Sequence, residues 1–163
     1  VAYVLDFLAI AATDLGSISE RRTDRFLDVS RNRGLPHFLA NDAGVDSGLM
    51  IAQYTQAALV SENKRLSVPA SVDSIPSSAM QEDHVSMGWH AARKLRKVVD
   101  NLRRILAVEL IAAARAVELR APLKPAPVTG ELISILRERV PGMGPDRDLG
   151  EELAQAYELL LAK

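Results

Sequence analysis

The longest helical pattern in the chain runs over residues 84–120 and limits what the chain can fold into. Apolar side chains recur in it at spacings of three and four, the period of one helix face. These are Leu95, Val98, Val99, Leu102, Ile105, Leu106, Leu110, Ala113 and Val117. Within residues 105–117 only Glu109 and Arg115 are charged, so most of that half should be buried. A helix this long exceeds what a compact monomer of 163 residues needs, and it predicts an elongated bundle completed by other chains.

Two further long stretches are predicted to be helices, one at residues 1–31 and one at residues 47–65. The first has helically spaced apolar residues, namely Tyr3, Phe7, Ile10, Leu15 and Ile18. The second follows a loop at residues 34–47, and either Asp46 or Ser47 is a suitable N-cap. Because it is apolar on most faces, we expect it to be buried in the middle of the bundle. Its Gln, Asn and Glu side chains would then need partners, most simply a polar network between helices.

The C-terminal quarter of the chain is predicted to be a separate, smaller unit. Pro122, Pro125 and Pro127 make a short linker. Helical spacings then recur over residues 130–140 and 148–162, with a Gly- and Pro-rich turn between them. No stretch alternates as a strand would. The expected fold class is therefore all-α: an elongated bundle of long helices at residues 1–121 and a small helical C-terminal appendage at residues 122–163.

Composition narrows the class of protein. A hydrophobic content of 48% and a net charge of −1 exclude a disordered chain and give no general electrostatic reason to bind nucleic acid or membrane. No apolar run reaches bilayer-spanning length without charges, so we expect a cytoplasmic protein. There is no cysteine, and the histidines His37, His84 and His90 lack acids at ligand spacing, so no metal site is expected. Because the chain opens at Val1 inside an apolar helical pattern, without Met or a cap, we expect it to be part of a longer protein.

Polar side chains crowd the junction between a Pro- and Ser-rich loop and the longest helix. The sequence there reads Gln81-Glu82-Asp83-His84, followed by Ser86. Loops held by a rigid scaffold carry many functional sites, which favours a site here. The alternative is structural, with Asp83 or Ser86 capping the helix that follows. The residues alone leave both interpretations open.

Four motifs, in order along the chain, resemble histidine ammonia-lyases of the aromatic amino acid lyase family. They are Gly-Ser-Ile-Ser-Glu-Arg-Arg from Gly16, Gly-Leu-Met-Ile-Ala-Gln-Tyr-Thr from Gly48, Leu-Val-Ser-Glu-Asn-Lys from Leu59, and the stretch from Val72 to Gly88. The last of these resembles the family's C-terminal signature, and together the motifs span about residues 1–120. The resemblance implies elimination of ammonia from L-histidine to give trans-urocanate.

The resemblance also implies a cofactor, a partner and a substrate class. Family members use a methylidene-imidazolone electrophile made from an internal Ala-Ser-Gly tripeptide. No Ala-Ser-Gly occurs in these 163 residues. We therefore expect a C-terminal part of the enzyme, inactive alone, with no cofactor-binding residue of its own. Family members are homotetramers whose active sites combine residues from more than one subunit. The expected partners are thus copies of the same protein and a small amino-acid substrate, with neither nucleic acid nor membrane.

Of the family's active-site residues, only a glutamate maps onto this chain, at Glu82. The resemblance gives it a catalytic and substrate-binding role, and a buried carboxylate can pair with a cation or act as a base. Relatives that act on phenylalanine or tyrosine usually carry Asn-Gln-Asp at this place, so Glu82 with His84 favours histidine. Gln81 and Asp83 are expected to hold the loop in place, and Asp83 and His84 to serve the helix start. Two positions depart from the commonest family pattern: Met80 replaces a small or polar residue, and Trp89 follows Gly88 where Pro or Thr is frequent.

Two alternatives to a histidine ammonia-lyase follow from the same residues. One is a tyrosine or phenylalanine ammonia-lyase of the same family. The other is a non-catalytic helical module that only promotes oligomerisation.

Overall fold

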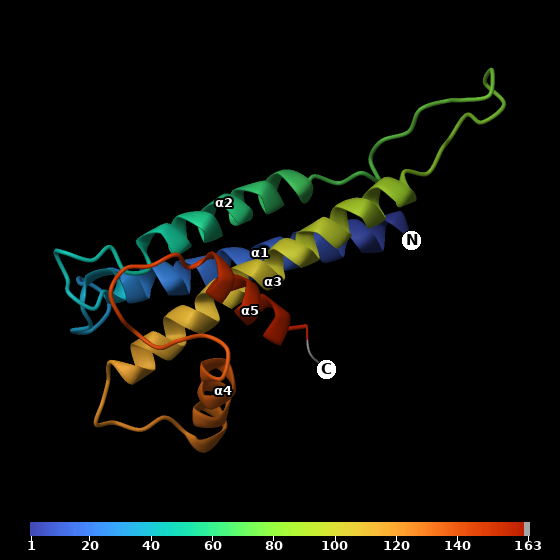
Figure 1. Cartoon of the computed structure of the whole chain (residues 1–163). Helices are drawn as coiled ribbons and strands as arrows, with labels where there is room; N and C mark the ends of the chain where they lie inside the picture. Colours follow the sequence, from blue (N-terminus) through green and yellow to red (C-terminus); the bar gives the residue numbers. More distant parts are fainter. Residues whose placement is uncertain (162–163) are drawn as a thin grey trace.

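Three long helices lie along one another and set the shape of the molecule (Figure 1). The computed structural model describes residues 1–161. In that range the long helices are α1 (Ala2–Leu27), α2 (Met50–Leu66) and α3 (Gly88–Glu118), and the short ones are α4 (Pro127–Arg137) and α5 (Gly150–Leu159), with a single 3-10 turn at His37–Leu39. No β-strand is present in this range. The predicted all-α class and elongated bundle are confirmed.

The direction of the helices brings distant segments together. α1 and α3 run in the same direction and pack along each other (Figure 1). α2, which lies between them in the sequence, runs in the opposite direction. The N-terminus, the end of α2 and the start of α3 therefore meet at one end of the bundle. The loop that joins α2 to α3 projects from that end.

The middle of the bundle has a polar interior. α1 turns small and polar side chains inward, among them Thr13, Gly16 and Ser19. Gly16 lets α3 approach closely, since an added Cβ would lie 3.2 Å from the Ile105 side chain. Asn101 Nδ2 donates to Asn63 Oδ1 at 2.9 Å and so joins α3 to α2. Buried amides paired in this way fix the register of the helices.

A second pair of bonds completes this polar interior. Gln56 Nε2 donates to the Ile105 carbonyl at 2.9 Å, and Ser19 Oγ donates to Glu109 Oε2 at 2.6 Å. The predicted inter-helix network of buried polar side chains is therefore confirmed. It links all three long helices, and it includes the Glu109 carboxylate, which also pairs with Arg22.

The end of the bundle away from the loop that joins α2 to α3 has an apolar core that includes the C-terminal helices. Buried residues there come from α1, the following loop, α2, α3, α4 and α5, and they include Leu27, Leu39, Leu49, Ile111, Leu136, Val140 and Ala156. Tyr157 of α5 also donates its hydroxyl to Asp100 Oδ1 of α3 at 2.5 Å, and Arg104 lies over its ring. The segment after residue 121 thus shares one core with α3.

One long face of α1 is apolar and exposed. Phe7 is 66% exposed and Leu15 58% exposed, and they lie on the same side as Tyr3, Val4 and Ile18. By length and composition α1 passes the test for a membrane-crossing helix, with a window of mean hydropathy 1.3, and 28% of that window is buried. The buried part includes the carboxylate Asp6. This face is the main apolar surface that the bundle itself leaves open along α1.

Several predicted helix boundaries were wrong. α1 ends at Leu27 instead of residue 31, because the Asp28 side chain accepts from the Ser30 N–H at 2.9 Å and closes a turn. α4 begins at Pro127, which suits the first helical position and does not belong to the linker. α5 spans Gly150–Leu159, shorter than the predicted 148–162; residues 162 and 163 lie outside the described residues.

Two predictions about α2 were also wrong. Neither Asp46 nor Ser47 caps it, because the helix begins at Met50 and its N-cap is Leu49. The helix is buried on one face only, since Ile51 is 58% exposed and Tyr54 59% exposed. α2 therefore lies on the surface of this chain's bundle.

Candidate functional site

The candidate site lies on the projecting loop between α2 and α3, residues 67–87 (Figure 1). At its tip the chain reverses through a short hairpin closed by two main-chain bonds. The Ser77 N–H donates to the Glu82 carbonyl at 3.0 Å, and the Glu82 N–H donates to the Ser77 carbonyl at 3.3 Å. A side chain bonds the two arms further down, where the Val85 N–H donates to Ser74 Oγ at 2.9 Å. These bonds place Glu82 at the end of the loop, away from the helices.

The turn inside this hairpin has an unusual backbone. Ser78, Ala79 and Met80 follow one another with φ of 54°, 53° and 73°. Consecutive left-handed residues are costly for L-amino acids because Cβ crowds the next carbonyl. Strain of this kind persists where surrounding structure enforces it, and it concentrates at functional sites.

The base of the loop is fixed to α1 by a buried carboxylate. Asp6 is 2% exposed, and its Oδ2 accepts from the Ser71 N–H at 2.8 Å. Lys94 of α3 lies 4.0 Å from Asp6 Oδ1 and also donates to the Val68 carbonyl. Burial alone would raise the pKa of Asp6, but hydrogen bonds from Ser71 and Ala70 and the charge of Lys94 lower it overall. Asp6 is therefore ionised at neutral pH and anchors the loop.

All four residues singled out from the sequence lie together on this loop and are exposed. Gln81, Glu82, Asp83 and His84 follow the turn directly, and their side chains form no hydrogen bond or ion pair within residues 1–161. The Gln81 N–H donates to the Ser78 carbonyl at 3.1 Å, so its contribution to the loop is through the main chain. Within this chain the Glu82 carboxylate is exposed, because the loop extends beyond the bundle.

The structural alternative, in which these residues cap the start of α3, is wrong for Asp83 and His84. α3 begins at Gly88 and its N-cap is Met87, so both residues precede the helix by several positions. Only Ser86 acts locally, since its Oγ accepts from the Gly88 N–H at 3.3 Å. The hairpin and the Ser74 bond hold residues 82–85 outside the helix, which begins at Gly88. Met80 and Trp89 are exposed as well, at 70% and 79%.

This arrangement presents the Glu82 and Asp83 carboxylates and the His84 imidazole on an exposed loop. Among the described residues no group of three or more potential ligands could hold a metal ion. A cleft of about 590 Å³ lies at the base of the loop, lined partly by Asp73, His90 and Lys94. Glu82 is at the tip instead. A substrate bound at Glu82 would therefore not lie in this cleft.

Sequence reasoning missed Asp6 and Lys94, which position the loop. A signal was present, because Asp6 is a lone carboxylate in an otherwise apolar stretch of α1. Such a residue is rarely buried unless something pairs with it. Its partner, a backbone N–H 65 positions later in the chain, leaves no mark in the sequence.

We expect Asp6→Ala to lower the stability of the loop base at neutral pH. The Ser71 N–H would lose a charged acceptor, a loss of about 1.5–3 kcal/mol. Because the pKa of Asp6 is lowered from 3.8, its contribution is complete above that pH and disappears as pH falls through the lowered value. Thermal unfolding should separate the variant from the parent at pH 7 and bring them together in acid. The exposed Asp14 of the same helix gives the control, Asp14→Ala; an equal effect there would contradict the assignment.

Comparison with known proteins gives a consistent picture. Residues 1–138 match the family described as aromatic amino acid lyase. The histidine ammonia-lyase of Streptomyces avermitilis is 73% identical over 157 residues, which are 96% of this chain and 31% of that protein. The crystal structure of histidine ammonia-lyase from Trypanosoma cruzi matches with a TM-score of 0.94 and 46% identity, over 98% of this chain and 31% of that one. Tyrosine aminomutase from Streptomyces globisporus matches with a TM-score of 0.94 and 39% identity, over 98% of this chain and 30% of that one. This chain thus spans about a third of the length of each.

Proposed function

This chain belongs to the aromatic amino acid lyase family, and from that membership we propose that it forms part of a histidine ammonia-lyase. The proposed reaction is the non-oxidative conversion of L-histidine to trans-urocanate and ammonia. The chain contributes Glu82 to the active site, while other segments supply the rest. By itself it is inactive.

The observation that carries this proposal is the placement of Glu82. Its carboxylate stands at the tip of an anchored loop, next to a strained turn, with no partner among residues 1–161. The bundle makes no use of it. A charged side chain held at a fixed place with nothing to bind suggests a partner from outside this chain.

The chemistry gives a carboxylate two uses. Elimination breaks the bond between Cα and the amino nitrogen and removes a proton from Cβ, so that ammonia leaves and a carbon–carbon double bond forms. A carboxylate near the substrate can hold its ammonium or imidazolium group by charge, or it can accept a proton. Of the family's active-site residues, Glu82 is the one that the resemblance maps onto this chain. Gln81, Asp83 and His84 flank it and define its surroundings.

Histidine is the substrate that the chain's features favour. The pair Glu82 and His84 stands where relatives acting on phenylalanine or tyrosine usually carry an amide-rich sequence. Identity is 73% to a histidine ammonia-lyase and 39% to a tyrosine aminomutase, which supports the same choice. The alternative within the family, a lyase for tyrosine or phenylalanine, is tested below.

The family's methylidene-imidazolone electrophile does not fit within this chain. There is no Ala-Ser-Gly here from which it could form. Glu82 stands on an exposed tip, and the described residues around it provide no enclosed cradle. No step through that group is therefore assigned to these residues, whose part is to place a carboxylate.

We also propose that the protein acts as a homo-oligomer, a tetramer as in the family, in the cytoplasm. The exposed apolar face of α1, with Phe7 and Leu15, supports association, since monomeric proteins rarely leave such a continuous apolar face open. Glu82, which has no partner among residues 1–161, suits a site completed by a neighbouring subunit. A non-catalytic oligomerisation module would share the apolar face but would not need Glu82.

A hybrid enzyme tests the proposed function. In it, this chain replaces the matching 157 residues of the Streptomyces avermitilis histidine ammonia-lyase. We expect the purified hybrid to release ammonia from L-histidine, and to act on L-tyrosine and L-phenylalanine at least about a hundredfold less efficiently, as expected where a polar side chain must be matched. A preference for either aromatic substrate would refute histidine as the substrate. A folded hybrid with no lyase activity would favour the oligomerisation module.

A further inference from the structure

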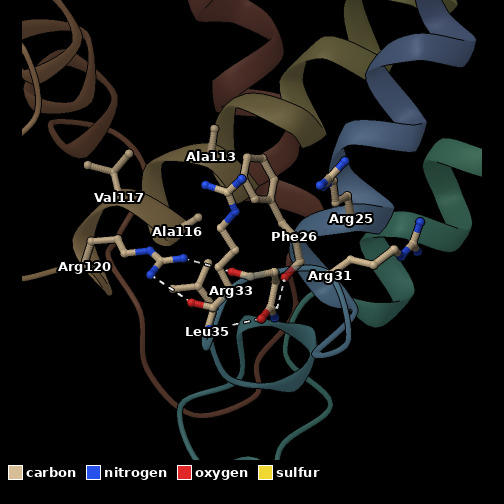
Figure 2. Close-up of a pocket in the computed structure, with 10 residues that line it drawn as sticks. Arg25, Phe26, Arg31, Arg33, Leu35, Ala113, Ala116, Val117 and Arg120 are labelled. Carbon is tan, nitrogen blue, oxygen red and sulfur yellow. Dashed lines mark hydrogen bonds between the residues drawn. The ribbon is translucent and has the colours of Figure 1, made fainter.

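A second candidate site lies at the opposite end of the bundle from the Glu82 loop. It is a pocket of about 430 Å³ between the end of α1, the loop at residues 28–36 and the end of α3 (Figure 2). Its apolar lining comes from Phe26, Leu35, Ala113, Ala116 and Val117. Small-molecule sites are commonly of this size and lined in this way, with a few polar groups for orientation.

Arginines surround this apolar lining. Four of them border the pocket, Arg25, Arg31, Arg33 and Arg120, and no acidic residue does. Two are committed to the fold. Arg31 pairs with Asp24 and Asp28, and Arg120 donates to the carbonyls of Asn32 and Arg33 at 2.9 and 3.0 Å.

The other two guanidinium groups are unpaired. Neither Arg25 nor Arg33 forms an ion pair or a side-chain hydrogen bond within residues 1–161. In Figure 2 the Arg33 side chain extends from its loop toward Ala113 and Phe26, across the pocket. Arg25 projects from α1 on the other side of Phe26. Arg33 thus crosses the pocket, while Arg25 borders it from the far side of Phe26.

The backbone at Arg33 adds an independent observation. Its φ is 60°, in the left-handed region, which glycine and asparagine adopt readily and residues with long side chains rarely adopt. The conformation directs the guanidinium over the pocket. A costly backbone state that aims a charge into a cavity is more readily understood as serving a ligand than as serving the fold.

We propose that this pocket binds a small carboxylate with an apolar body. The free guanidinium groups match a carboxylate, because the planar fork of arginine pairs with its two oxygens. The apolar lining requires a hydrophobic remainder, which inorganic anions lack. The volume suits a small molecule. This inference is independent of the proposed lyase function and concerns residues distant from Glu82.

Titration of the 163-residue chain with benzoate tests this site, using calorimetry and amide chemical shifts. We expect saturable binding, with shifts at Phe26, Ala113 and Ala116. Benzamide, which keeps the ring without the charge, and sulfate, which keeps charge without the ring, should each bind at least about tenfold more weakly. Equal binding of benzamide or of sulfate would overturn the proposed carboxylate specificity, and shifts centred elsewhere would overturn the location.

A substitution at Arg33 separates binding from folding. Arg33→Gly removes the guanidinium and suits the left-handed backbone, so stability should be kept or raised while benzoate binding weakens at least about tenfold. Arg25→Gln should weaken it as well. Arg96→Gln, at an exposed arginine near the start of α3, is the matched control and should leave affinity unchanged. Undiminished binding in both Arg33→Gly and Arg25→Gln would refute the site.

Discussion

Glu82→Gln in the hybrid enzyme is expected to lower kcat for L-histidine by about 10²- to 10⁴-fold, the range typical for loss of a group that transfers or holds a proton. Glutamine keeps the size of the side chain and its acceptor oxygen but removes the charge. The structure gives no reason for a folding defect, because the carboxylate has no partner in residues 1–161. A rate loss with unchanged thermal stability is therefore the expected combination. Steady-state kinetics and a melting curve measure the two quantities.

A control for this substitution lies on the same loop. Asp73 is an exposed carboxylate near the loop base, and Asp73→Asn removes one negative charge there without touching the tip. We expect that variant to keep its rate within about twofold, as for a surface change away from the site. If Glu82→Gln and Asp73→Asn behaved alike, Glu82 would have no special role in turnover.

Gly48→Ala is expected to destabilise the chain by about 2–4 kcal/mol, the largest stability effect we expect from adding one methyl group. Gly48 has φ of +58°, and a Cβ added there would lie 2.6 Å from the Phe38 carbonyl oxygen and 3.0 Å from Ala40 backbone atoms. Backbone atoms cannot move aside as a flexible side chain can. The Leu49 N–H also donates to that Phe38 carbonyl at 3.0 Å, so a shift would cost this bond too. Urea unfolding at fixed protein concentration gives the free energy of unfolding.

Gly34 provides the matched comparison. Its φ is +85°, but nothing lies within 4 Å of an added Cβ. Gly34→Ala thus carries the conformational strain without the close approach, and we expect it to cost about 1 kcal/mol. Losses of equal size at the two glycines would show that backbone strain alone matters and that the packing against Phe38 does not.

The long helices were predictable because their apolar residues repeat at the helical period over many turns. The network of Gln56, Asn63 and Asn101 was predictable in kind, because amides in a buried helix must find partners. Its detailed pairing was not. Each bond joins residues far apart in the chain, such as Asn101 to Asn63, and depends on how closely α1 approaches α3 at Gly16.

Features set by contacts between distant loops escaped sequence reasoning. The turn at residues 141–148 reads as a plain connection, yet Asp146 accepts from the N–H groups of Ser47 and Gly48 at 2.7 and 2.8 Å. These bonds lower the pKa of Asp146 and tie the C-terminal segment to the start of α2.

The candidate site also has one part that the sequence predicts and one part that depends on contacts between distant residues. The motif around Glu82 predicts which residue reaches the active site, because it carries a resemblance that spans most of the chain. Its exposure at the tip of a projecting hairpin was not predictable, since that depends on the bonds of Ser77 and Ser74 and on Asp6 at the loop base. The helical pattern predicted a helix from residue 84, although α3 begins only at Gly88, and so it gave no sign of the hairpin.

The central claim is that Glu82 belongs to a lyase site whose other parts lie outside this chain. The most direct measurement compares the purified 163-residue chain with the hybrid enzyme, each supplied with L-histidine, by the ultraviolet absorbance of urocanate. We expect no urocanate above background from the chain and steady formation from the hybrid. Turnover by the chain alone would contradict the claim, and so would a correctly assembled hybrid that forms none.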